Sequence, residues 1–319
     1  MTKKTISILA RFSSRFLVKC TVAVGLLALS FGCKKNSMGT GNQAGAGALL
    51  IKVLKIGYNG SGVKIDSSVV TISWAPDSQI VQTFQIEIMY EQGLTLIDSL
   101  TTFYTYNGNQ ISSTQQLITT QTDVTGNPPA GLDDTVNSTF FTSGGQVTNL
   151  VQVGTISSYG FSPPQNGQTI DSGSLTYNAN GSVATYNTYQ SSNGSAYAPV
   201  FDQAFSYSGN NLAGYVLTNT DPLAPGNTTA TYTYNNHVSA SALYNVIPGI
   251  TLPSSNDVSE LTLDQVGGIY PGQTTYTYHS TYNGLNQPIS SSVIVSTTVT
   301  AQAYLLLTPV TEKISYFYQ

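Results

Sequence analysis

The side chains that could support acid–base or nucleophilic chemistry are few and scattered in this sequence. Its 319 residues contain 15 carboxylates, and the only close pair of glutamates is Glu87 and Glu91. On a strand these two would share a face about 13 Å apart, wider than the separation that a glycosidase uses. No G-x-S-x-G nucleophile elbow occurs. We therefore expect no catalytic residue and no cofactor.

Metal binding is the other chemistry that these residue types could support. The two histidines, His237 and His279, both lie beside predicted turns. Asp133 and Asp134 follow a Pro-Pro loop, but a calcium site needs about six to eight oxygen ligands and no loop motif supplies them. Exposed turn histidines and solvated loop carboxylates explain these residues more simply. We therefore expect no metal site.

Charged residues are scarce, at 8% of the chain against an average of about 25%. From residue 33 onward there are six lysines and no arginine, against all 15 carboxylates, and no basic residue lies between Lys64 and Lys313. Nucleic-acid binding depends on basic side chains that neutralise phosphates. The sequence therefore excludes a nucleic-acid partner.

The first 32 residues have the pattern of an export signal. Five basic residues precede or begin the apolar run at 20–31, which is too short to span a bilayer comfortably. Cys33 follows at once, and the rest of the chain contains no second cysteine with which it could pair. Ordinary signal-peptidase cleavage after Gly32 is the alternative, because Ser30 and Gly32 satisfy its requirement for small residues.

The sequence Ser-Phe-Gly-Cys that ends at Cys33 resembles the lipobox of bacterial lipoproteins, and Cys-Lys-Lys-Asn is similar to lipoproteins of the Bacteroidetes. This resemblance implies that residues 1–32 are a lipoprotein signal peptide and that Cys33 carries the lipid, palmitate included. Residues 33–47 then form the lipidated N-terminus and a flexible tether to the outer membrane. Because no acidic residue follows the cysteine closely, the periplasmic face is favoured over the cell surface.

A recurring sequence motif runs through the rest of the chain, and residues 173–189, GSLTYNANGSVATYNTY, are a clear example. An aromatic residue precedes a turn rich in Asn and Gly, and an aliphatic residue follows it, which is typical of a β-hairpin. If Asn180 and Gly181 form a two-residue turn, Gly181 has a positive φ and Tyr177 lies opposite Ala184. Thr176 and Thr185 then pair on the other face of the hairpin. The aromatic anchors of the six copies are Tyr106, Phe141, Tyr177, Tyr207, Tyr234 and Tyr282.

This repeated motif, over roughly residues 85–319, resembles the YD repeats of RHS-type proteins. It also resembles Bacteroidetes envelope lipoproteins built from similar hairpins. Most copies lack the Asp that gives YD repeats their name. We expect residues 48–319 to form a single all-β repeat domain, a meander of stacked β-hairpins in an open, curved antiparallel sheet. At most one short helix is expected, at residues 256–266, where Glu260 would complete a capping box.

These features predict a monomeric, membrane-anchored envelope lipoprotein with a binding or structural role. Its partners are the bilayer, through Cys33, and either carbohydrate or another envelope protein; Trp74 and surplus tyrosines could stack on sugars. The alternative is a hydrolase of envelope or extracellular polysaccharide, with carboxylates brought together by the fold. Two tripeptides, Asp-Ser-Leu and Asp-Thr-Val, resemble the Bacteroidetes O-glycosylation acceptor and make Ser99 and Thr135 candidate sites.

Overall fold

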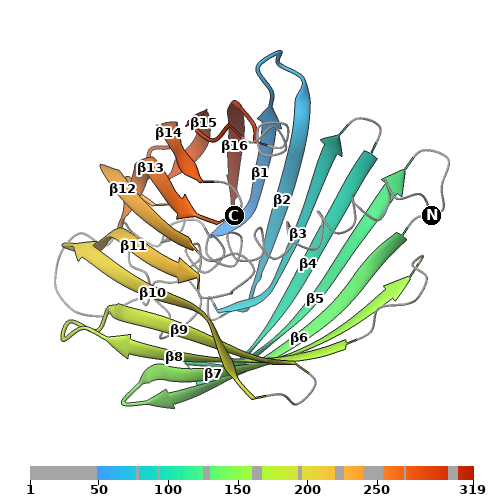
Figure 1. The fold of residues 1–319 in the computed structure, drawn as a ribbon. Helices are drawn as coiled ribbons and strands as arrows, with labels where there is room; N and C mark the ends of the chain where they lie inside the picture. The colour runs from blue at the N-terminus through green and yellow to red at the C-terminus, as the bar shows by residue number, and fades with distance from the viewer. Residues whose placement is uncertain are drawn as a thin grey trace.

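The chain forms a closed antiparallel β-barrel of sixteen strands in a computed structural model (Figure 1). The structure describes residues 49–76, 79–91, 94–108, 110–124, 130–159, 167–192, 196–219, 226–239, 254–268, 271–300 and 308–319. The expected all-β class is confirmed, but the expected open sheet is wrong, because the first strand pairs with the last. Residues 1–48, with the predicted signal peptide, Cys33 and tether, lie outside the described residues.

The strands follow one another around the barrel in chain order. They are β1 Leu50–Tyr58, β2 Lys64–Trp74, β3 Ile80–Glu91, β4 Leu94–Asn107, β5 Gln110–Val124, β6 Ala130–Ser143, β7 Gln146–Tyr159, β8 Gly167–Tyr177, β9 Val183–Ser192, β10 Ala198–Ser208, β11 Asn211–Asn219, β12 Gly226–Val238, β13 Asn256–Gly267, β14 Gly272–Tyr282, β15 Pro288–Thr297 and β16 Thr311–Tyr318.

Closure removes the sheet edges that an open meander would expose. Val53 of β1 lies opposite Val70 of β2 on one side and opposite Tyr316 of β16 on the other. An open sheet presents unpaired N–H and C=O groups at two edge strands, and lysine side chains commonly guard such edges. Here β1 and β16 do carry three lysines, Lys52, Lys55 and Lys313, but the two strands are not left as edges. Pairing β1 with β16 satisfies both edges with backbone hydrogen bonds.

The helix expected at residues 256–266 is also wrong, because these residues form β13. Leu261 lies opposite Tyr232 of β12 and Tyr276 of β14, so the segment is paired on both sides. Its apolar and polar residues alternate as a strand requires, with Leu261 buried and Asp264 exposed. Tertiary pairing therefore overrides the local capping-box pattern, and no helix occurs among the described residues.

The turns of the recurring motif lie at one rim of the barrel, which we call the turn rim. There even-numbered strands end and odd-numbered strands begin. At this rim the last aromatic residue of β2, β8, β12 and β16 donates a hydrogen bond to a carbonyl at the start of the strand before it. Tyr177 of β8 bonds the carbonyl of Val147 at 2.6 Å. The same bond joins Tyr234 to Leu212, Tyr318 to Pro288, and the Trp74 indole to Leu50. Each tyrosine thus ties its own hairpin to the preceding one.

The turns confirm part of the hairpin prediction and correct its register. Gly181 has φ +84°, as predicted, but the connection runs from residue 178 to 182 and is not a two-residue turn. A bulge between Thr176 and Tyr177 places Tyr177 opposite Val183, not Ala184. In the second copy Phe141 is exposed, and its neighbour Phe140 is the residue that packs against the core.

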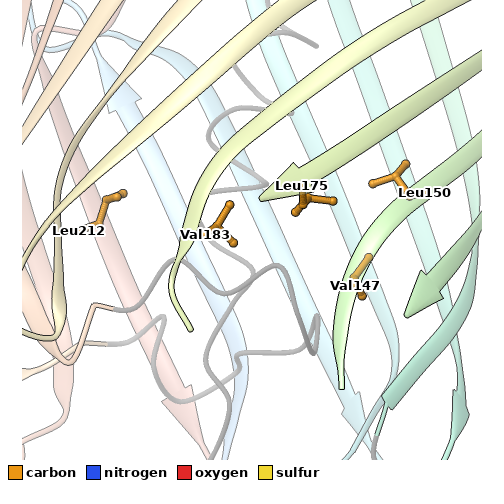
Figure 2. Close-up of a cluster of buried hydrophobic side chains, with 5 residues drawn as sticks. All are labelled: Val147, Leu150, Leu175, Val183 and Leu212. Carbon is orange, nitrogen blue, oxygen red and sulfur yellow. The ribbon is translucent and has the colours of Figure 1, made fainter. Parts of the chain in front are cut away.

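Side chains alternate between two surfaces of this closed sheet, which we call the inner wall and the outer wall. In β15, Ser291, Val293 and Val295 are buried, whereas the intervening Ser292 and Ile294 are exposed. The strand register continues the surface that holds Ser291, Val293 and Val295 around the barrel. Three buried hydrophobic clusters lie on this surface. Figure 2 shows one cluster, built from β7, β8, β9 and β11. The surface that buries its own side chains is the inner wall.

Candidate binding site on the inner wall

The inner wall combines aromatic and aliphatic clusters with buried polar side chains such as Thr83, Thr102 and Gln203. One cluster joins Tyr215, Leu217, Ala230 and Leu261, with further aromatic side chains from β10, β12 and β14 packed against it. Burial raises the pKa of Tyr215 to about 12. Barrels of about sixteen strands enclose more space than their wall side chains fill. In agreement with this, Ile118 on the same wall is only half-buried.

Carboxylates also face inward, and they gather toward the rim opposite the turn rim. We call Asp66, Glu87, Asp98 and Glu312, from β2, β3, β4 and β16, the acidic arc. The register places Glu87 directly opposite Asp98, and Gly57 of β1 opposite both Asp66 and Glu312. Like charges directly opposite each other destabilise a sheet. Asp66, Glu87 and Asp98 lie within 32 residues of one another in the chain, whereas Glu312 lies 246 residues from Asp66, so only the fold brings all four together.

One lysine, Lys55 of β1, faces this arc. Its Nζ lies 3.4 Å from Glu312 Oε1 in a partly buried ion pair. Burial alone would lower the pKa of Lys55, but attraction to Glu312, Asp66 and Glu87 outweighs it and raises the pKa. Asp66 is 6% exposed, and its Oδ1 accepts no hydrogen bond among the described atoms. The arc therefore carries more negative charge than its single lysine balances.

Two more carboxylates lie farther around the inner wall, Asp134 on β6 and Asp171 on β8. Burial raises the pKa of both, and the charge on Asp171 adds to the shift at Asp134. Gln190 of β9 donates a 2.9 Å hydrogen bond to Asp171 Oδ1. Asp134 Oδ1 accepts no hydrogen bond among the described atoms. The predicted loop position of Asp134 is wrong: it belongs to a strand and faces inward.

The two histidines lie in different surroundings. His237, near the end of β12, stacks on Tyr282 with ring centroids 3.6 Å apart, and its Nδ1 contacts Asn286 Oδ1. Tyr282 in turn donates to Asp257 Oδ2 at 2.9 Å. His279 is exposed on β14. The described residues contain no group of three or more His, Cys, Asp or Glu side chains that could hold a metal ion.

The other predicted residues are not brought into one site. Ser99 of β4 and Thr135 of β6 are half-buried on the outer wall, opposite Ile86 and Leu117 respectively. Glu87 faces inward, but its opposed partner is Asp98, whereas the side chain of Glu91 lies outside the described residues. The Glu87–Asp98 pair could not be found from sequence spacing, because the register across a hairpin creates it.

The outer wall is rich in hydroxyl and amide groups over most of the circumference. Thr176 and Thr185 contact each other at 2.7 Å across β8 and β9, as the sequence predicted. Thr262 and Thr275 form a similar pair across β13 and β14. Carboxylates on this wall are Asp133, Asp202, Glu260 and Asp264. Barrels that span membranes carry a continuous apolar band on the outside, which the described residues over this part of the outer wall do not form.

No helix in the described part of the chain is long and apolar enough to cross a membrane. No protein-family model matches the chain, and no curated protein is significantly similar to it. A crystal structure of a porin-like protein from Bacteroides uniformis ATCC 8492 matches with a TM-score of 0.45 and 14% identity, over 85% of this chain and 96% of that one. A porin-like protein from Bacteroides vulgatus ATCC 8482 matches with a TM-score of 0.36 and 9% identity, over 86% and 99% of the two chains. Both resemblances are remote, and neither assigns a function to this chain.

Proposed function

We propose that this protein is a lipoprotein of the bacterial outer membrane, anchored through Cys33 on the periplasmic face. Its barrel stands in water as a monomer and binds a ligand inside without catalysis. The observation that carries this proposal is the polarity of the two walls. Three clusters of tyrosine and aliphatic residues lie on the inside, interspersed with buried threonine and glutamine side chains, whereas threonine pairs and carboxylates cover most of the outside. A wall with Glu260 and Asp264 outside would be costly to place in lipid.

The inner wall favours an amphiphile, a molecule with an apolar chain and a polar head. The clusters at the turn rim combine aliphatic residues such as Leu150 and Leu175 with tyrosine rings. The acidic arc lies toward the other rim and offers oxygen acceptors for a hydroxyl-bearing head. Aromatic rings alone would also stack on sugars, so carbohydrate is the competing ligand class. The experiment must therefore distinguish a response to the alkyl chain of a ligand from a response to its sugar.

Trp74 is the only tryptophan in the chain and packs against the inner-wall cluster of Leu50, Ile72 and Ile80, so its fluorescence reports on the lumen. We expect dodecyl maltoside, below its critical micelle concentration, to shift this fluorescence saturably, and maltose to leave it unchanged. Ile118→Gln, inside, should weaken the response several-fold, whereas Leu117→Gln, the adjacent outward residue, should not.

Three results would contradict this proposal. A response to maltose equal to that of dodecyl maltoside would identify a carbohydrate-binding protein. Equal effects of Ile118→Gln and Leu117→Gln would place the ligand outside the lumen. Release of dodecanol or glucose from the amphiphile would favour the alternative hydrolase, with the opposed Glu87 and Asp98 as its carboxylate pair.

A further inference from the structure

The outer wall is not uniform around the barrel. The outward residues of β16, β1, β2, β3 and β4 form a surface that we call the lysine panel. Across it the register aligns two mainly aliphatic rows: Leu54, Val69 and Ile86 in one, and Ile56, Ser67 and Ile88 in the other. Ile97 extends the second row onto β4. These aliphatic rows distinguish the panel from the opposite side, where paired threonines such as Thr176 and Thr185 face outward.

Lysines and aromatic rings bracket these rows at both ends. At the end nearer the turn rim, Lys52 Nζ lies 5.5 Å from the centroid of the Phe317 ring. At the other end, Lys313 lies 5.6 Å from the Tyr58 ring and Lys64 lies 5.3 Å from the Tyr90 ring. Lys52 and Tyr58 are six residues apart on β1, about 20 Å along the strand. Aromatic residues and lysines at such positions are typical of a membrane–water interface.

Charge is divided between the two sides of the barrel. All the described outward-facing lysines, Lys52, Lys64 and Lys313, belong to the panel. The described outward carboxylates lie elsewhere, on β6, β10 and β13. A chain with so few basic residues therefore presents them together, around apolar rows and away from its outer carboxylates. A surface of this kind complements an anionic lipid surface.

We propose that the lysine panel docks the barrel sideways on the anionic surface of the bilayer. The apolar rows contact the acyl boundary while Lys52, Lys64 and Lys313 meet lipid phosphates. The contact lies on the outer wall, so it is separate from the ligand site inside, although it agrees with the anchored location proposed above. The panel would provide a second attachment to the bilayer in addition to a lipid at Cys33.

Vesicle sedimentation tests this docking with residues 34–319, which hold the whole closed barrel and no acylation site. We expect binding to vesicles of phosphatidylcholine with about 30% phosphatidylglycerol, and much weaker binding to phosphatidylcholine alone or in high salt. The double variant Lys64→Gln and Lys313→Gln, at exposed positions, should reduce binding at least tenfold. The matched control, Asp202→Asn and Asp264→Asn, changes two exposed charges on the other side and should not reduce it.

Unchanged vesicle binding by the lysine double variant would overturn the proposal, as would equal binding to neutral and anionic vesicles. A third contrary result is a concentration-dependent dimer, measured by analytical ultracentrifugation, that the double variant abolishes; the panel would then face a second copy of the chain. The dodecyl maltoside titration of the double variant separates the two proposals. A double variant that loses vesicle binding but keeps the Trp74 response supports both proposals. Loss of the Trp74 response would count against the proposed ligand site in the lumen and would leave the docking proposal to be decided by vesicle binding.

Discussion

At the scale of single residues, the carboxylates show that the exposure and pKa of a side chain depend on whether it lies on the inner or the outer wall. Asp133 and Asp134 are adjacent, yet Asp133 is exposed on the outer wall and Asp134 faces inward. Burial raises the pKa of Asp134 above its ordinary 3.8, because the charged form loses hydration there. Sequence alone placed both in a solvated loop, since nothing in two successive aspartates reveals which one points inward.

Asp134→Asn should therefore stabilise the barrel at neutral pH. A carboxyl whose pKa is higher in the folded than in the unfolded state favours folding while it is protonated, and the folded state loses that advantage as pH rises through the folded pKa. The amide removes this cost, so the gain in melting temperature should be present at pH 7 and vanish as pH falls below about 3.8.

Asp133→Asn is the matched control and should change the melting temperature little at either pH. A gain from Asp134→Asn that persisted unchanged into acid would show that the charge of the buried carboxylate is not its cause.

At the scale of elements, the hairpin is the repeating unit, and a tyrosine such as Tyr177 forms a hydrogen bond to the preceding hairpin. The sequence predicted the aromatic residue, the glycine at positive φ and the aliphatic residue that follows. It did not reveal that Tyr177 reaches the carbonyl of Val147, 30 residues earlier. Glutamines continue the same linkage between turns: Gln79 donates to the carbonyl of Gly108, and Gln110 to that of Gly145. Contacts between successive hairpins thus stabilise the turn rim.

Tyr177→Phe tests this linkage. The substitution keeps the ring but removes the hydroxyl that bonds Val147, so it should lower the free energy of unfolding by about 1 kcal/mol. Chemical denaturation measures the change. Tyr197→Phe is the control, because Tyr197 is 52% exposed, and it should be close to neutral. Equal effects of the two substitutions would refute a specific role for the Tyr177 hydroxyl.

At the scale of the whole molecule, closure and anchoring are distinct features of the protein. Closure depends on β1 and β16, the two ends of the described barrel, which pair along their length. Anchoring, as proposed above, would depend on Cys33, which precedes β1 by 17 residues. A segment of this length would let the barrel place its lysine panel on the bilayer while a lipid at Cys33 stayed inserted.

Cys33→Ser should move the protein from a salt-resistant to a salt-sensitive membrane fraction. The acyl chain would be lost, whereas attraction between the panel and anionic lipid would persist at low salt and be screened at high salt. Fractionation of cells at two salt concentrations, with the mass of the purified protein, measures both effects. A variant of unchanged mass that still resists salt extraction would contradict acylation at Cys33.

The sequence by itself determined the class of structure, because turn residues and β-branched alternation act over a few positions. The all-β class, the positive φ at Gly181 and the pairing of Thr176 with Thr185 were all predictable in this way. Only the tertiary structure decided that the sheet closes, that residues 256–266 form a strand, and that Glu87 faces Asp98. These features depend on register and on pairing between distant segments, since a shift of one residue exchanges the inner and outer walls.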